Sequence, residues 1–185
     1  YDNIIGVCTN SGGAGSEPCE AGDTENGGEA EVQGIEVVAN YALSVASFDT
    51  PLSMTYTYTD AEFQSSFVGS SVWGAVEEGD KLPNLPEHQL TLSAGLRLDN
   101  GFGGDLRLRY FDETCATAAC GEFDSIDEHT AIDLSAYYDW NQQTRFFVNV
   151  ANLLDEDEDI VARQPKAGAR TQMPRTFMAG VSYQF

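Results

Sequence analysis

The sequence predicts an all-β fold, built as an antiparallel up-and-down meander of about eight strands. Three observations predict it. Apolar side chains recur at every second position in one segment after another, and helical periodicity is absent. Long polar connections alternate with short ones along the chain. The final segment, 176–185, places an apolar series on one face, because successive side chains in a strand point to opposite faces. That series is Phe177, Ala179, Val181, Tyr183 and Phe185.

The alternation predicts the strands in order. After a short and weakly patterned segment at 1–7, strands are predicted at 31–43, 52–59, 89–98, 105–110, 132–140, 146–150 and 176–185. Leu90, Leu92 and Leu96 illustrate the apolar series of one strand. Thr91 and Ser93 belong to its polar series. Each strand is therefore expected to present one apolar and one polar face to the sheet.

The connections between these segments alternate in length. Long connections are predicted at 8–28, 62–84, 113–126 and 155–173, and short ones at 44–50, 99–101 and 140–143. The short connection Asp99-Asn100-Gly101 carries the Asn-Gly signal of a β-hairpin. A meander collects all the long connections at one end and all the tight turns at the other. Bacterial outer-membrane barrels have this asymmetry, so the pattern favours a transmembrane β-barrel.

Other all-β classes also alternate with period two. A soluble β-sandwich, including a carbohydrate-binding one, is one alternative. A stand-alone eight-stranded outer-membrane barrel with a structural or adhesion role is another. The polar faces favour a wide barrel over both, because they carry many small side chains that would leave a narrow barrel unfilled, together with charged groups suited to a watery interior. These residues include Thr55, Thr57, Thr91, Ser93, Gly95 and Ser135, with Asp105 expected beside Arg107 and Arg109.

Composition narrows the function. The 185 residues include 30 acidic and 9 basic ones, giving a net charge of -21, so a nucleic-acid partner is not expected. No segment approaches the ~20 consecutive apolar residues of a membrane-spanning helix. No arrangement of side chains typical of an enzyme stands out, and neither an enzyme activity nor a cofactor is expected. The chain opens on Tyr1 without a signal peptide, which favours a processed product or a fragment.

Four cysteines form two local pairs in polar connections, Cys8 with Cys19 and Cys115 with Cys120. An even number in this setting favours disulfides and an oxidising compartment. A zinc site is the alternative. It is disfavoured because neither pair has the two-residue spacing common in zinc ligands, and His88 and His129 are distant in sequence.

Four further stretches stand out along the chain. They are EVQGIE at 31–36, LPNLPEHQL at 82–90, VANLLDE at 150–156, and PRTF at 174–177, which leads into a final strand that ends at Phe185. Together they resemble the C-terminal part of a TonB-dependent outer-membrane receptor: in order, the strand after a large outer loop, the start of the following strand, a motif near the receptors' end, and the final strand. Their order and spacing match over nearly the whole chain, although Leu154 stands where an aromatic residue is usual.

The resemblance implies a 22-stranded barrel, to which residues 1–185 contribute the C-terminal part, while the plug domain and the earlier strands are absent. It implies a receptor of the bacterial outer membrane that takes up a scarce ligand, usually a ferric siderophore, by active transport. The implied partners are outer-membrane lipid, the ferric chelate, TonB acting through the absent plug region, and the barrel-assembly machinery, which would recognise Phe185. The loop sequences and Gly168-Ala169-Arg170 look most like the ferric-citrate-type branch.

Candidate site residues follow from the outer loops. Arg163, Lys166 and Arg170 are expected to attract an anionic ferric chelate, and His88 and His129 lie near the rim where they could touch it. The alternatives are that the basic residues offset neighbouring acids and that the histidines have no ligand role. In the acidic run 155–159, carboxylates of Asp155, Asp157 and Asp159 are candidate ligands of a divalent cation. The alternative is a solvated flank of the loop.

We predict that non-reducing peptide mapping will recover two disulfides, Cys8–Cys19 and Cys115–Cys120. Each closes a short loop, so its loss should cost only about 2–3 kcal/mol of stability. Recovery of all four cysteines as free thiols, with alkylation before proteolysis as the control against exchange, would contradict the prediction.

Overall fold

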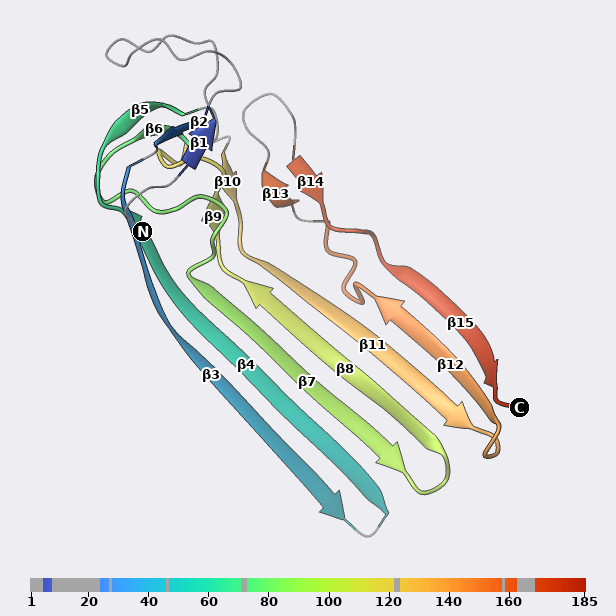
Figure 1. Ribbon diagram of the computed structural model, residues 1–185. Helices are drawn as coiled ribbons and strands as arrows, with labels where there is room; N and C mark the ends of the chain where they lie inside the picture. The colour runs from blue at the N-terminus through green and yellow to red at the C-terminus, as the bar shows by residue number, and fades with distance from the viewer. Residues whose placement is uncertain are drawn as a thin grey trace.

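The computed structural model describes residues 5–7, 24–26, 28–45, 47–70, 73–121, 124–157, 159–162 and 169–185. Its main feature is a seven-stranded antiparallel sheet in which the strands lie side by side in chain order (Figure 1). The strands are β3 (Ala30–Val45), β4 (Phe48–Phe63), β7 (His88–Leu98), β8 (Phe102–Phe111), β11 (His129–Asp139), β12 (Thr144–Ala151) and β15 (Thr176–Tyr183). The predicted meander is confirmed.

Short hairpins gather at one end of this sheet, where the long connections lie (Figure 1). They are β1 (Ile5–Val7) with β2 (Thr24–Asn26), β5 (Phe67–Ser70) with β6 (Gly74–Val76), β9 (Thr114–Cys115) with β10 (Ser125–Ile126), and β13 (Asp159–Ala162) with β14 (Ala169–Thr171). The opening segment is therefore not an eighth strand of the sheet. It pairs locally with Thr24–Asn26, and the main sheet of the described residues has seven strands.

The sheet is open. Its order runs from β15 through β12, β11, β8, β7 and β4 to β3, and among the described residues neither outer strand has a second partner. The backbone groups on those two edges are therefore available for pairing. A self-contained closed barrel would need β3 or β1 to pair with β15, and this pairing is not observed within the described ranges. In the same ranges, no helix has the length and apolar character needed to cross a membrane.

The turns at the other end follow from local sequence. Asp99-Asn100-Gly101 joins β7 to β8, and Gly101 has a φ of 88°, a conformation that favours glycine. At the next turn, the side-chain oxygen of Asn141 accepts hydrogen bonds from the backbone N–H groups of Gln143 and Thr144, each at 2.8 Å. The short connection predicted at 44–50 is mostly wrong, because β3 and β4 pair as far as Val45 and Phe48.

The two faces of the sheet differ as the alternation predicts. One, here called the apolar face, carries large side chains that remain exposed, such as Ile35, 63% exposed, and Val181, 60% exposed. The other, here called the polar face, carries Thr91, Asp133 and Asn149 at alternate positions. A continuous apolar face of this extent is typical of a surface that meets lipid or another partner.

An aromatic row on the polar face was not predicted. Tyr137 of β11 pairs in register with Phe147 of β12, and the outer neighbours of this pair are Gly103 of β8 and Gly180 of β15. A Cβ atom at Gly180 would lie 2.6 Å from the tip of the Phe147 ring. Because Gly103 and Gly180 have no side chain, the Tyr137 ring can lie over Gly103 and the Phe147 ring over Gly180. The Arg145 guanidinium stacks 4.0 Å from the centre of the Tyr137 ring.

A small buried core lies where β3 and β4 meet the loops. Phe63 is fully buried there, and its ring contacts Phe67 and Trp73 with centroid separations of 5.5 and 5.7 Å. Val76 of β6 completes the same cluster. Burial of this size stabilises by about 1.5–3 kcal/mol for each large side chain. The loop end thus has a small apolar core of its own.

The disulfide predicted between Cys115 and Cys120 is present, with the two Cα atoms 5.2 Å apart. It closes the segment that follows β9, and Cys120 takes a positive φ of 43°. Cys8 and Cys19 lie outside the described residues, so their pairing stays a prediction.

We predict that Gly180→Ala lowers the free energy of unfolding by about 1–3 kcal/mol, because the new methyl group displaces the Phe147 ring. The urea midpoint in detergent measures it. The loss should shrink in a Phe147→Ala background, where the methyl group has room. An equal loss in both backgrounds would show that the ring is not the cause, and Ser182→Ala on the same strand serves as the control.

Candidate functional site

A cavity of about 760 Å³ lies on the polar face, at the end of the sheet that carries the long loops. Strands β7, β8 and β11 form its floor, and two loop segments, near 84–86 and near 172–173, form its sides. Its volume falls in the range of small-molecule sites. Gln89, Arg109, Phe111, His129 and Asp133 reach it because each occupies a polar-face position of its strand.

Asp133 links the floor of the cavity to a loop base. One carboxylate oxygen accepts a hydrogen bond from the Arg109 guanidinium on the neighbouring strand at 2.7 Å. The other accepts the backbone N–H of Asn152 at 3.1 Å. The sequence suggested instead that Arg109 and Arg107 would associate with Asp105. The partner of Arg109 is Asp133, which lies opposite Arg107 on the neighbouring strand and is therefore a diagonal neighbour of Arg109.

Asn152 holds the base of the last long loop together. It is 4% exposed, and its side chain donates to the backbone oxygens of Glu156, at 2.6 Å, and Met173, at 2.9 Å. Its side-chain oxygen accepts the Glu156 N–H at 3.1 Å. Asn152 has a φ of 52°, which asparagine tolerates better than most residues. The side chain of Asn152 thereby joins the two ends of the loop.

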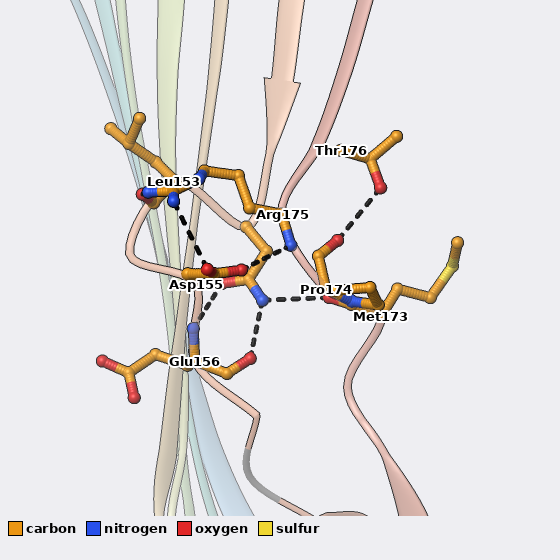
Figure 2. Close-up of polar contacts among 8 residues, drawn as sticks. Leu153, Asp155, Glu156, Met173, Pro174, Arg175 and Thr176 are labelled. Carbon is orange, nitrogen blue, oxygen red and sulfur yellow. Dashed lines mark hydrogen bonds and ion pairs between the residues drawn. The ribbon is translucent and has the colours of Figure 1, made fainter.

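A second clasp at the same loop base joins Asp155 and Arg175 (Figure 2). The carboxylate of Asp155 accepts the backbone N–H of Arg175 at 2.8 Å and its guanidinium at 3.3 Å. The same guanidinium also donates to the backbone oxygen of Leu153 at 3.3 Å. These bonds fix where the chain leaves β12 and where it enters β15. They hold the wall of the cavity at 172–173 in place.

The opposite wall is a short loop closed by an ion pair. Lys81 and Glu87 meet at the two ends of the segment whose middle residues line the cavity. The hydrogen bond that the Lys81 ammonium donates to the Glu87 carboxylate raises the pKa of Lys81 above its ordinary value. The backbone N–H of Asn84 donates to the carbonyl of Cys115 at 2.7 Å, which ties this wall to the disulfide-closed segment.

The two histidines lie on opposite faces. The His129 ring stacks on Phe111 with centroids 5.1 Å apart, on the polar face and in the cavity. His88 lies on the apolar face, where Nδ1 is 2.9 Å from the Tyr56 hydroxyl and its ring is 5.3 Å from that of Tyr58. The predicted role of His88 in ligand contact therefore has no support from the cavity geometry, and it stays a prediction.

The remaining predicted site residues are placed only in part. Arg163 and Lys166 lie outside the described residues, and of Arg170 the backbone alone is described, in β14. Asp155 is engaged by Arg175, while Asp157 is exposed. The structure describes Asp159 as the first residue of β13. No cluster of three metal-ligating side chains occurs among the described residues, so the cation site stays a prediction. Phe185 is fully exposed, with its ring 5.1 Å from that of Tyr183.

The sequence did not predict that Arg109, Asn152 and Gln172 line the same cavity. Asn152 stood within a recognised motif, but nothing in the motif showed what its side chain would bond. Gln172 lies in a connection without pattern. These residues come together through the register between three strands. Alternation with period two does not determine that register.

Comparison with known proteins identifies the architecture. A family model for the TonB-dependent receptor-like β-barrel matches residues 1–153. Solved structures with the same fold include the siderophore receptor PiuA from Acinetobacter baumannii, with 21% identity over 86% of this chain and a TM-score of 0.71, and the ferric-catecholate import receptor Fiu from E. coli K12, with 20% identity over 100% and a TM-score of 0.69. The copper transporter OprC is a third, with 16% identity over 100% of this chain and a TM-score of 0.62.

The chain spans only 22%, 24% and 27% of the lengths of these three proteins, respectively. No curated protein matches it. The structural neighbours, at this level of identity, establish the fold.

We predict that Asn152→Gly frees the base of the last long loop. Glycine keeps the backbone conformation but removes three hydrogen bonds, each worth about 1 kcal/mol. Hydrogen exchange of peptides covering 153–157 and 171–175 should accelerate by about tenfold to a hundredfold. Asn149→Gly on the polar face of β12 is the matched control, and equal acceleration of the loop peptides in both variants would contradict the assignment.

Proposed function

Because the chain belongs to the family of TonB-dependent receptor-like β-barrels, we propose that it forms part of the wall of an outer-membrane receptor that actively takes up a scarce ligand. The match of the family model over residues 1–153 carries the proposal. The ligand class we propose is a ferric siderophore or a similar chelate. Such uptake needs no covalent chemistry, so no catalytic residues are required.

Three features of the sheet support this role. Its apolar face suits contact with lipid, because barrels of the outer membrane turn apolar side chains outward and polar ones inward. Its long connections, with the cavity between them, gather at one end, where extracellular loops lie in such barrels. Its two open edges suit further strands of a larger barrel, since an unpaired edge is not tolerated in hydrocarbon.

The proposed partners follow from the family. They are outer-membrane lipid, a ferric chelate, TonB acting through a plug region that this chain does not include, and the barrel-assembly machinery. Arg163, Lys166 and Arg170 of the last loop are proposed to contact the chelate, and Phe185 to be recognised during assembly. The stand-alone eight-stranded barrel gains no support, since the main sheet has seven strands in the described residues and is open.

The proposal is tested by producing the complete receptor in cells that lack their own ferric-chelate receptors. Uptake of radioactive iron from a panel of ferric chelates is measured in otherwise identical strains with and without TonB. We expect at least one chelate to enter only when TonB is present. Entry that is independent of TonB, or failure of every chelate despite normal receptor abundance, would refute the proposal.

A further inference from the structure

The polar-face cavity contains three polar atoms that its walls leave unused. Arg109 Nε, His129 Nδ1 and Gln172 Oε1 are buried and have no hydrogen-bond partner among the described residues. All three residues line the same cavity. Buried polar groups are normally paired, and leaving one unpaired costs about 1–3 kcal/mol. Three in one small space indicate that a bound species completes their hydrogen bonds.

The chemistry of these three atoms indicates which hydrogen-bonding groups the bound species carries. Arg109 Nε donates a hydrogen bond, Gln172 Oε1 accepts one, and His129 Nδ1 does either, according to its tautomer. The bound group must therefore offer both acceptor and donor atoms, as a secondary amide does, whereas an iron-bound hydroxamate offers acceptor atoms only. The rest of the lining is largely apolar and includes Leu85, Phe111, Ile126 and Met173. Methylene-rich linkers between the polar groups would fit such walls.

The charge of the cavity limits the charge of its ligand. The positive charge of Arg109 is already matched by Asp133 at 2.7 Å. Asp112, also in the lining, adds a negative charge, and the whole chain carries a net charge of -21. The described lining therefore has no excess of positive charge to offset a polyanion. A neutral or singly positive ligand avoids that electrostatic cost.

Resting on the proposed function, we infer that this cavity binds a neutral or singly positive, part-apolar ferric chelate that carries secondary amide groups, such as an amide-linked hydroxamate, through Arg109, His129 and Gln172. This ligand class differs from the polyanionic ferric citrate that loop resemblance suggests. It also assigns ligand contact to the wall of the barrel, on β8, β11 and the segment before β15, rather than to the loop tips alone.

The test measures binding in the complete receptor, purified in detergent, by quenching of intrinsic fluorescence. Two probes differ in charge: ferrioxamine B, a singly positive trihydroxamate complex, and ferric enterobactin, a trianionic tricatecholate complex. We expect tighter binding of ferrioxamine B. His129→Ala and Gln172→Met should each raise its Kd about three- to tenfold, the loss expected for one hydrogen bond.

Matched controls use residues that lie away from the cavity. Thr130→Ala changes the next residue of β11, on the apolar face, and Gln143→Met changes a glutamine at the opposite end of the sheet. Neither should alter the Kd. Because binding is read without transport, loss of TonB-dependent uptake with intact binding counts against the proposed function alone.

Four outcomes overturn the inference. They are tighter binding of the trianionic complex, binding of neither probe, site variants that behave like their controls, and equal weakening of both probes with a lower urea midpoint. The last result would show that the three atoms serve contacts within the receptor, such as those with a plug segment, rather than the chelate.

Discussion

Backbone pairing across the seven strands is the constraint on which the rest of the structure depends. Pairing that is unbroken over β3 and β4, from Ala30 opposite Phe63 to Val45 opposite Phe48, satisfies the backbone and forces side chains to alternate between two faces. A shift of one residue in any strand would exchange its faces. The register therefore determines both placements at once: apolar side chains lie on the apolar face, and Arg109, His129 and Asp133 lie on the polar face.

Polar bonding is concentrated where the sheet meets its loops. Along the middle of the polar face, contacts are simple cross-strand ones, such as Ser135 Oγ donating to Asn149 Oδ1 at 2.7 Å. At the loop end, Asp133 accepts from both Arg109 and Asn152, and Asn152 in turn bonds the two ends of a loop. These hydrogen bonds attach the bases of the loops to the paired strands. The cavity walls are therefore held in place, although loop segments form them.

The fold was largely predictable from the sequence, because alternation with period two is a local signal. It located all seven strands of the main sheet and the Asn-Gly turn at Gly101. Strand ends were less predictable: residues 44–50 look like a turn, with Pro51 beside them, yet pairing with a long partner extends β4 back to Phe48. The segment around Ile5 alternates weakly, and its local partner at 24–26 lacks pattern.

The candidate site was much less predictable, since it depends on contacts between residues distant in sequence. The Cys115–Cys120 bridge was predictable from its local spacing. The Arg109–Asp133 pair joins different strands, and the choice of Asp133 over the nearer Asp105 depends on the register between β8 and β11. The separation of His129 from His88 onto opposite faces follows from strand phase at the rim, where each residue begins its strand and the periodic signal is weakest.

The two clasps at the base of the last long loop have an evolutionary consequence. Asn152 and the Asp155–Arg175 pair close the loop at its stem, so the path of the chain beyond the stem does not determine how β12 and β15 approach each other. Lengthening a closed loop costs little, about 0.6 kcal/mol for each doubling of its length. Insertions and deletions between 157 and 171 can thus accumulate without disturbing the wall. The stem therefore uncouples the length of this loop from the pairing of β12 with β15.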